Sequence, residues 1–346
     1  MSDAKSGGRL PAEWEKEGAV LLAWPHGATD WNYMLERVQA CFKDMVEAML
    51  PWTKIVVVAP DTAEAERFLG GSRGGRLFYV QAETNDTWAR DYGPLSVETA
   101  DGVMSVLDFR FNGWGLKFAS CYDNQIVKAL CDRRLITAPR QNMQWFVMEG
   151  GGLESDGQGT LMTTAHCQLS ANRNPWLSRE EIERTLLETF SAKKLIWLEH
   201  GYLAGDDTDS HIDTLARFAP YNTIIYTGCD DADDEHYEEL QAMERELMQA
   251  TTIDGQPFNL IRLPLPDAVF DEDGNRLPAT YANFLALKHA VILPVYGQAR
   301  KDALAKQMLQ IAFDVPVVTV DCRALIEQHG SLHCMTMQMP SEILAI

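Results

Sequence analysis

A short segment in the second half of the chain gathers ionisable side chains at alternate positions. GDDTDSHIDTLARF (205–218) places Asp207, Asp209, His211 and Asp213 two residues apart. In an extended conformation all four would project to one face, because successive side chains of a strand point to opposite sides. Such a face predicts a polar reaction site, a solvated edge strand, or a metal site made of carboxylate and imidazole ligands.

Two further segments carry carboxylates beside turn-forming residues. TNDTWARDYGPLSV (84–97) sets Asp91 before a Gly-Pro turn, where a loop can present the carboxylate to a cleft; the alternative for its Arg-Asp pair is an ordinary ion pair. MEGGGLESDG (148–157) has Glu149 followed by three glycines, of which Gly150 is the first. Glycine lets backbone approach a ligand closely. Three consecutive glycines lack the spacing of a dinucleotide-binding loop, so we do not expect nucleotide binding.

The candidate nucleophile lies near the C-terminus, in HGSLHCMTMQMP (329–340). A lone cysteine such as Cys334 is usually a small buried hydrophobe. As a nucleophile it needs a neighbouring base or cation, because a thiol with an ordinary pKa of about 8.5 is mostly protonated at neutral pH. His211 and a bound cationic substrate would both meet that need.

Short apolar runs separated by helical patterns predict the elements that must position these side chains. The β-rich runs are KIVVVA (54–59), RLFYVQ (76–81), NTIIYT (222–227), AVILPV (290–295) and PVVTV (316–320). Apolar residues at helical spacing predict a helix over 35–49, Ser178 with Glu181 gives a capping-box signature, and 230–249 is typical of a solvated helix. The class is therefore α/β. No repeat is visible and no linker divides the chain, so we expect one domain over 1–346.

Composition limits the partners. Lys and Arg number 30 against 50 Asp and Glu, a formal charge of −20, which disfavours nucleic acid and anionic membranes and suits a small cation. The seven cysteines contain no Cys-x-x-Cys pair, which is typical of reduced thiols in the cytoplasm. The opening MSDAKSGGRL has no apolar signal core, and no apolar run approaches the roughly 18 residues that a membrane span needs.

Taken together, these segments resemble the guanidine-modifying pentein superfamily, and within it the family of agmatine deiminases and bacterial peptidylarginine deiminases. The matching motifs, between about 85 and 340, are TWARDYGP, FNGWGLKF (111–118), EGGG, SHIDTLARF, YANFLALKHAVILPVYG (281–297) and GSLHC. The resemblance implies a five-bladed α/β propeller of pseudo-fivefold ββαβ units, with the active site on its axis.

The resemblance also implies the catalytic residues, which are Cys334, His211, Glu149, Asp91 and Asp213. Asp91 and Asp213 would hold the guanidinium, whose planar N–H donors suit carboxylates. Cys334 would attack the guanidinium carbon to form an S-alkylthiouronium, and His211 would protonate the leaving ammonia and then activate water. Glu149 would bind substrate or orient His211. No metal or organic cofactor is required.

The implied substrate is agmatine, which is hydrolysed to N-carbamoylputrescine and ammonia on a route to putrescine. Asp207, four positions before the catalytic histidine, would bind the distal ammonium, and Gly150 would let backbone approach the substrate. Trp88 and Trp114 would wall the aliphatic tail, with core packing as the alternative for each. Many relatives carry Glu at the position of Asp207 and an acidic residue at that of Gln298.

These two departures leave a peptidylarginine or free-arginine deiminase as the alternative within the family. A metal-dependent hydrolase that uses the face from Asp207 to Asp213 is a different mechanistic class, and a non-catalytic amine-binding protein is a third. A homo-oligomer is possible on this sequence.

Overall fold

The computed structural model describes residues 7–346; residues 1–6, part of the opening segment considered above for a signal core, lie outside the described residues. Within the described part, no helix combines the length and the apolar character needed to cross a membrane. The strands of residues 7–346 form five mixed sheets of three or four strands and one two-stranded ribbon.

The strands of each sheet, in spatial order, have the following bounds. The first sheet contains β18 (Met337–Pro340), β1 (Gly18–Ala23), β2 (Lys54–Ala59) and β3 (Leu77–Gln81). The second contains β4 (Leu95–Glu98), β5 (Met104–Arg110) and β6 (Arg140–Val147), and the third β7 (Glu154–Ser155), β8 (Thr160–Thr164) and β9 (Lys194–Leu198). The fourth contains β10 (Ala216–Ala219), β11 (Thr223–Gly228) and β12 (Asn259–Pro264), and the fifth β15 (Leu285–Leu287), β16 (Ala290–Val295) and β17 (Val317–Asp321). The ribbon pairs β13 (Val269–Phe270) with β14 (Arg276–Leu277).

The helices are short or of moderate length. They are α1 (Leu35–Met49), α2 (Thr62–Leu69), α3 (Ala89–Tyr92), α4 (Gly113–Leu116), α5 (Ile126–Asp132), α6 (Ala165–Gln168), α7 (Arg179–Thr189), α8 (Tyr237–Gln249) and α9 (Ala299–Phe313). One-turn 3₁₀ helices are η1 (Asp30–Met34), η2 (Asp123–Gln125), η3 (Gly150–Gly152), η4 (Ile212–Thr214), η5 (Ile326–Gln328) and η6 (Ser341–Ile343).

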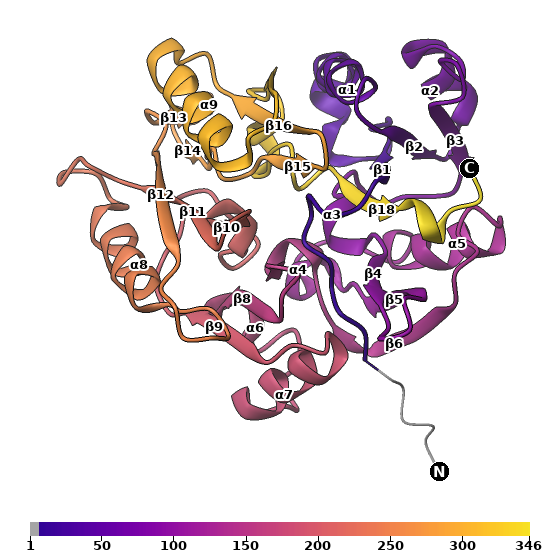
Figure 1. Ribbon diagram of the computed structural model, residues 1–346. Helices are drawn as coiled ribbons and strands as arrows, with labels where there is room; N and C mark the ends of the chain where they lie inside the picture. Colours follow the sequence, from indigo (N-terminus) through magenta and orange to yellow (C-terminus); the bar gives the residue numbers. More distant parts are fainter. Residues whose placement is uncertain (1–6) are drawn as a thin grey trace.

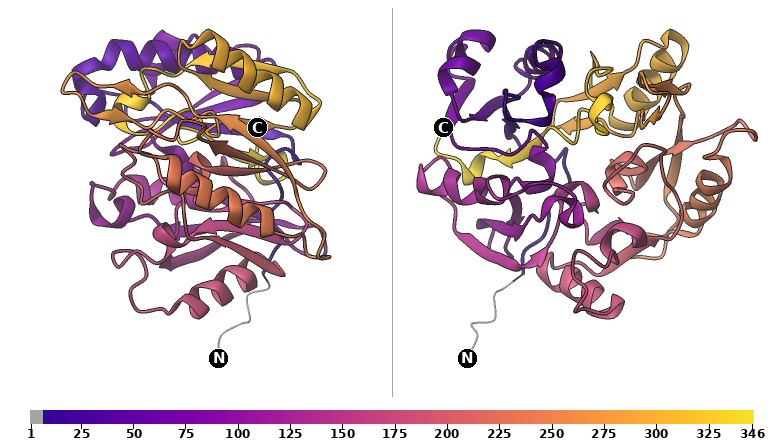
Figure 2. Two further views of the ribbon diagram at one scale, coloured as in Figure 1. Left: turned by 90° about the vertical axis from the view of Figure 1, so that its left-hand side faces the viewer. Right: turned by 180° about the vertical axis from the view of Figure 1, so that it is seen from behind.

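The sheets share one connection pattern that was not visible in the sequence. In each, an antiparallel pair is followed by a parallel pair, and a helix joins the two parallel strands, as α5 joins β5 to β6 and α9 joins β16 to β17. The first sheet follows the same pattern only because the C-terminal strand β18 pairs antiparallel with β1. Figure 1 shows the sheets around a common centre with α1, α5, α7, α8 and α9 outside them, and the reverse view in Figure 2 shows the same arrangement.

Most predicted elements are confirmed. The runs 54–59 and 290–295 coincide with β2 and β16, and the other three predicted strands match β3, β11 and β17 to within a residue at each end. The helix over 35–49 is α1, and Ser178 caps α7 with both capping-box hydrogen bonds. The predicted helix over 230–249 begins only at Tyr237, because the Asp234 carboxylate accepts the backbone N–H of His236 and pairs with Arg276 in a preceding turn.

The extended conformation expected for 207–213 is wrong. Asp209 and Ser210 have φ values of 66° and 62°, and His211 leads directly into η4. The Asp206 carboxylate fixes this turn by accepting the Thr208 hydroxyl at 2.6 Å and the Ser210 N–H at 2.7 Å. Side chains two residues apart therefore do not share a face here.

Candidate active site

The predicted catalytic residues are brought together from connections that belong to different sheets. Asp91 lies on α3, Glu149 directly before η3, His211 directly before η4, Asp213 within η4, and Cys334 in the loop between η5 and β18. All five are buried, with no more than 5% of any residue exposed. Segments separated by more than 200 residues thus meet in one small volume.

The Asp91 carboxylate is fixed through both oxygens. Its Oδ1 accepts the backbone N–H of Gly151 at 2.9 Å, and its Oδ2 accepts the indole N–H of Trp114 at 2.9 Å. Burial raises the pKa of Asp91, with the neighbouring His211 acting in the opposite direction. The neighbouring Arg90 pairs instead with Glu13 at 3.1 Å, so the Arg-Asp dipeptide is not an ion pair.

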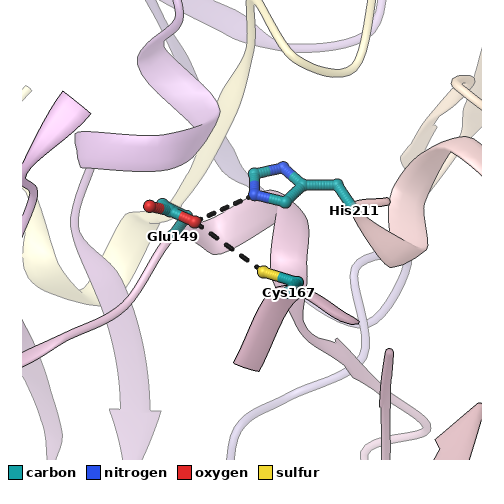
Figure 3. A group of neighbouring side chains, drawn as sticks. All are labelled: Glu149, Cys167 and His211. Atoms are coloured by element: carbon teal, nitrogen blue, oxygen red, sulfur yellow. Dashed lines mark hydrogen bonds and ion pairs between the residues drawn. The ribbon is translucent and has the colours of Figure 1, made fainter. Parts of the chain in front are cut away.

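His211 lies between two carboxylates. Its Nε2 is 3.0 Å from Glu149 Oε2, and its Nδ1 is 3.6 Å from Asp91 Oδ1 (Figure 3 shows the Glu149 side). Burial alone would lower the pKa of His211, but Asp91, then Cys167 and Glu149, outweigh it and place the pKa well above its ordinary value. The ring is therefore a protonated imidazolium at neutral pH, and it can donate a proton.

Glu149 is held by more than the histidine. The guanidinium Nε of Arg173 is 2.8 Å from Glu149 Oε2, and the Cys167 thiol is 3.8 Å from the same oxygen (Figure 3). Burial would raise the pKa of Glu149, but Arg173 and His211 lower it, so this carboxylate stays ionised. Breaking a buried pair by removing one partner typically costs about 3–5 kcal/mol, which makes Arg173 a structural anchor of the site.

The Cys334 thiol faces Asp213 and Asn283. Its Sγ is 3.7 Å from Asp213 Oδ2, 3.4 Å from Asn283 Oδ1 and 3.2 Å from Asn283 Nδ2. Burial, Asp213 and Asp91 together raise the pKa of Cys334 well above its ordinary value. His333 bonds to the same Asp213 oxygen at 2.7 Å, and the pKa of Asp213 is lowered because this bond outweighs burial.

The three polar groups converge above Gly151. A Cβ on this residue would lie 2.8 Å from Asp91 Oδ1, 2.8 Å from His211 Nδ1 and 3.0 Å from Asp213 Oδ2. A methyl group at this point would be too close to all three polar atoms, so they can converge here only because the residue is glycine. Asp213 Oδ1 and His211 Nδ1 are both buried without a hydrogen-bond partner. Gly150, the glycine predicted to approach substrate, instead packs against the Arg90 backbone.

A pocket open to solvent reaches Asp91 and Cys334. Its lining consists of Asp30, Asp86, Trp88, Asp91, Trp114, Phe118, Asp206, Asp207, Thr208, Thr214, Gln328, His329, Gly330 and Cys334. Both predicted tryptophans therefore lie in the lining, and Trp88 also packs on Trp31 with ring centroids 5.8 Å apart. Among the described residues this lining has five aspartates and neither lysine nor arginine.

The aspartates of the segment 205–213 have different surroundings. Asp207 lines the pocket, and burial raises its pKa to about 6, with His329 opposing the shift. Asp209 turns away and pairs with Lys117 at 2.7 Å and Arg173 at 2.6 Å. Gln298 lies outside the pocket lining, where its amide makes two hydrogen bonds to the backbone of Asp267, so its identity does not shape the pocket.

The metal-binding face predicted for Asp207 to Asp213 does not form, because the Asp209 carboxylate pairs with Lys117 and Arg173 instead. Two other groups within residues 7–346 have ligand atoms within 4.8 Å of one another. They are Glu149, Cys167 and His211, and Glu13, Glu154 and His333. Each contains a carboxylate already paired with a buried guanidinium, from Arg173 in the first group and Arg217 in the second. A cation beside these carboxylates makes both groups poor sites for a second cation.

Sequence reasoning missed several residues of the site. Asn283 and Gly151 lie inside motifs that were singled out, YANF and EGGG, so the signal was present but the residues were not chosen. Cys167 and Arg173 carried no local signal, since only the tertiary structure places them on Glu149. Glu13 lies far outside the segment in which the resemblance was noticed.

Comparison with known proteins agrees with this geometry. The statistical model of the Porphyromonas-type peptidyl-arginine deiminase family matches residues 9–340. The agmatine deiminase of Stutzerimonas stutzeri (strain A1501) is 30% identical over 358 residues, which cover 96% of this chain and 95% of the relative. A solved structure from Porphyromonas gingivalis, described as a "Putative Arginine Deiminase", is 46% identical with a TM-score of 0.92 and covers 97% of this chain and 99% of its own. An agmatine deiminase of C. jejuni solved with substrate bound is 36% identical with a TM-score of 0.89 and covers 95% of each chain.

The family match begins at residue 9, well before the first motif that carried the resemblance. It extends almost to the end of the chain and contains all five residues predicted to be catalytic. The resemblance inferred from the sequence is thereby confirmed, and the chain belongs to the Porphyromonas-type peptidyl-arginine deiminase family.

Proposed function

We propose that this protein hydrolyses agmatine to N-carbamoylputrescine and ammonia, and that it thereby contributes to putrescine formation. The observation that carries the proposal is the buried thiol at an acidic pocket: Cys334 shares the lining with five aspartates and no lysine or arginine of the described chain. Agmatine carries a guanidinium at one end and an ammonium at the other. Both charges match such a lining.

Asp91 and Asp213 are the groups that hold the guanidinium. The two carboxylates converge beside Gly151, and Asp213 Oδ1 has no hydrogen-bond partner, so it can accept an N–H of the guanidinium. The substrate cation offsets the two carboxylates that raise the pKa of Cys334, so binding favours the thiolate. Positioning of this kind can supply several kcal/mol of the barrier, about 7–11 kcal/mol in the most favourable cases.

The covalent step then follows from the placement of the thiol and the imidazolium. The Cys334 thiolate forms an S–C bond to the guanidinium carbon, and His211 gives a proton to the nitrogen that leaves as ammonia. The S-alkylthiouronium is attacked by water, whose proton passes to the now neutral His211. Collapse breaks the C–S bond, releases the ureido product and restores the thiolate, with the remaining hydroxyl proton passing to a neighbouring carboxylate.

The distal end of the pocket selects the substrate tail. Asp207, Asp206, Asp86 and Asp30 lie in the lining and suit an ammonium group. The α-carboxylate of free arginine would meet these carboxylates without a compensating cation. A free-arginine or peptidylarginine deiminase remains the second candidate, because the Porphyromonas gingivalis structure with 46% identity is described as an arginine deiminase.

We also propose that the five sheets form the blades of one catalytic domain, a five-bladed propeller with this site on its axis. The shared connection pattern of the sheets supports this reading. The reaction uses only side chains of the chain itself and requires no cofactor. A reducing compartment such as the cytoplasm suits a nucleophilic thiol, and the seven cysteines are all free.

The test is ammonia release from agmatine, free arginine and an N-acylated arginine amide, with wild type and Cys334→Ala. We expect agmatine to have the highest kcat/KM and Cys334→Ala to lose turnover by at least about 10⁴-fold. Cys131→Ala, which removes a half-buried cysteine of α5, is the matched control and should retain activity. Normal turnover by Cys334→Ala would overturn the mechanism, and preference for the acylated arginine would overturn the choice of substrate.

A further inference from the structure

The N-terminal segment reaches the back of the active site through one side chain. Glu13 has only 16% of its side chain exposed, and its two oxygens contact cationic groups from distant parts of the chain. Oε2 is 2.7 Å from Arg217 Nη2, and Oε1 is 3.1 Å from Arg90 Nη1 and 2.5 Å from His333 Nε2. Three segments that are far apart in sequence therefore meet on this carboxylate.

His333 connects Glu13 to a catalytic group. Its Nδ1 is 2.7 Å from Asp213 Oδ2, so the ring lies between two carboxylates with 1% of its side chain exposed. Arg217 Nη2 lies 3.0 Å from His333 Nε2 and 2.7 Å from Glu13 Oε2. The His333 ring is thus held in place between the Glu13 and Asp213 carboxylates.

Arg217 is itself held in place by several contacts, so its guanidinium can hold the Glu13 carboxylate. It forms an ion pair with Glu154 and donates to the carbonyl oxygen of Phe284 at 2.7 Å. Its side chain is 1% exposed, and it stacks on the Phe284 ring at 4.7 Å. Glu13 therefore contacts the buried, immobilised guanidinium of Arg217 rather than solvent.

The consequence for catalysis lies in the two oxygens of Asp213. Oδ2 is taken by His333 and lies 3.7 Å from the Cys334 sulfur, whereas Oδ1 is buried without a partner. Oδ2 also lies 3.0 Å from the Cβ position of Gly151, where Asp91 and His211 converge, so the bond from His333 fixes the Asp213 oxygen that faces the other predicted catalytic groups.

We propose that Glu13 and His333 are positioning residues of this active site. Glu13, supplied by the N-terminal segment, holds His333, and His333 orients the Asp213 carboxylate toward Cys334 and the substrate guanidinium. The inference rests on the proposed function in one respect, namely that Asp213 binds the cationic part of the substrate.

The first experiment compares Glu13→Gln, His333→Gln and the double variant with wild type. Glu17→Gln is the matched control, because Glu17 lies four residues from Glu13 but pairs with Lys288 and His289 at the surface. Agmatine hydrolysis is measured from pH 5 to 10 on full-length protein, together with thermal unfolding. The orienting partners of catalytic groups typically contribute about 10–100-fold to activity, and we expect kcat/KM to fall by that factor in both single variants.

The pH profile separates positioning from simple structural damage. Loss or misplacement of the His333 ring weakens the hydrogen bond that lowers the pKa of Asp213, so the acid limb of kcat/KM should move to higher pH in both variants. Glu13 acts only through His333, so kcat/KM of the double variant should fall no further than that of His333→Gln alone. Folded single variants with wild-type kcat/KM and an unmoved acid limb would overturn the proposal. Where His333→Gln fails to fold, Glu13→Gln decides, since its replacement leaves the packing volume nearly unchanged.

A second readout does not depend on turnover. Cys334 is alkylated with the cationic reagent 2-chloroacetamidine and with neutral iodoacetamide, and the ratio of the two rates is followed by peptide mass spectrometry. An oriented Asp213 favours the cationic reagent, so the ratio should fall in Glu13→Gln and His333→Gln and stay constant in Glu17→Gln. An unchanged ratio in the folded variants contradicts the positioning role. Wild type that hydrolyses no guanidine but keeps a high ratio would overturn the proposed function alone.

Discussion

Cys334 Sγ lies 3.7 Å from Asp213 Oδ2, and both residues are buried. A carboxylate at this distance opposes ionisation of the thiol, and the pKa of Cys334 is raised by burial, Asp213 and Asp91 together. A cation bound between these groups would offset the carboxylates and lower that pKa.

The first prediction concerns the free thiol. With no substrate present, alkylation of Cys334 by iodoacetamide should still be rising above pH 9, since only the thiolate reacts. The exposed Cys121 is the internal reference and should reach its plateau at lower pH. Peptide mass spectrometry across pH 6–11 gives both curves from one sample. A Cys334 midpoint at or below that of Cys121 would contradict the buried, carboxylate-facing thiol.

The second prediction separates binding from nucleophilicity. Asp213→Asn should lower kcat/KM for agmatine by about 10²–10⁴-fold, because one guanidinium acceptor and its charge are lost. The same change removes a negative charge beside the sulfur, so the midpoint for iodoacetamide alkylation of Cys334 should move to lower pH. Asp254→Asn, at an exposed position, is the control and should move neither quantity. An unchanged kcat/KM, or a midpoint that stays constant or moves to higher pH, would count against this role for Asp213.

The third prediction concerns the distal ammonium and pH. Burial raises the pKa of Asp207 to about 6, so this carboxyl is protonated below that pH and ionised above it. The KM for agmatine should therefore rise as pH falls through about 6, and Asp207→Asn should raise KM at pH 8 by about 10-fold, the equivalent of about 1.4 kcal/mol. Butylguanidine lacks the ammonium, so its KM should not respond to the substitution. An equal response from both substrates would exclude Asp207 as the group that binds the tail.

The fourth prediction concerns the addition of a single methyl group at Gly151. In Gly151→Ala the new methyl group would lie only 2.8–3.0 Å from polar atoms of Asp91, His211 and Asp213, so these three groups would have to shift. The backbone of Gly151 is not left-handed, so alanine brings no strain of that kind. We expect at least about 10²-fold loss of kcat/KM. The thermal unfolding temperature should change little, in contrast to kcat/KM.

The matched control for that change is Gly27→Ala. A Cβ at Gly27 would meet Asn32 at 3.7 Å, an ordinary contact outside the site. This variant should keep both activity and unfolding temperature. Full activity in Gly151→Ala would show that the reaction does not need these three groups to converge beside the glycine.

The local framework of the protein was largely predictable from the sequence. Apolar runs such as 290–295 are hydrophobic on both faces, which is typical of buried strands, and β16 is buried along nearly its whole length. The capping box at Ser178 needs only four residues of sequence, and both of its hydrogen bonds form. The connection pattern shared by the sheets was implied only by the family resemblance, because the sheets share connections and no visible sequence repeat.

The candidate site was likewise predictable only in part from the sequence. The sequence by itself determined the reactive side chains, since Cys334, His211, Asp91, Glu149 and Asp213 stand in motifs whose order identifies the family. It did not determine their directions. A two-residue spacing implies a common face only in an extended chain, and the left-handed backbone at 209 and 210 turns neighbouring side chains apart.

Only the tertiary structure decided what surrounds those side chains. Glu13, His333 and Cys167 reach the site from segments as far as 320 residues apart, and no local spacing encodes such contacts. The buried charges then set the pKa values: burial lowers the pKa of His211 but neighbouring groups, Asp91 first, raise it above its ordinary value, whereas burial and carboxylates together raise the pKa of Cys334. The sequence supplied the candidate nucleophile, and only the packing of distant carboxylates around it decides how readily its thiol ionises.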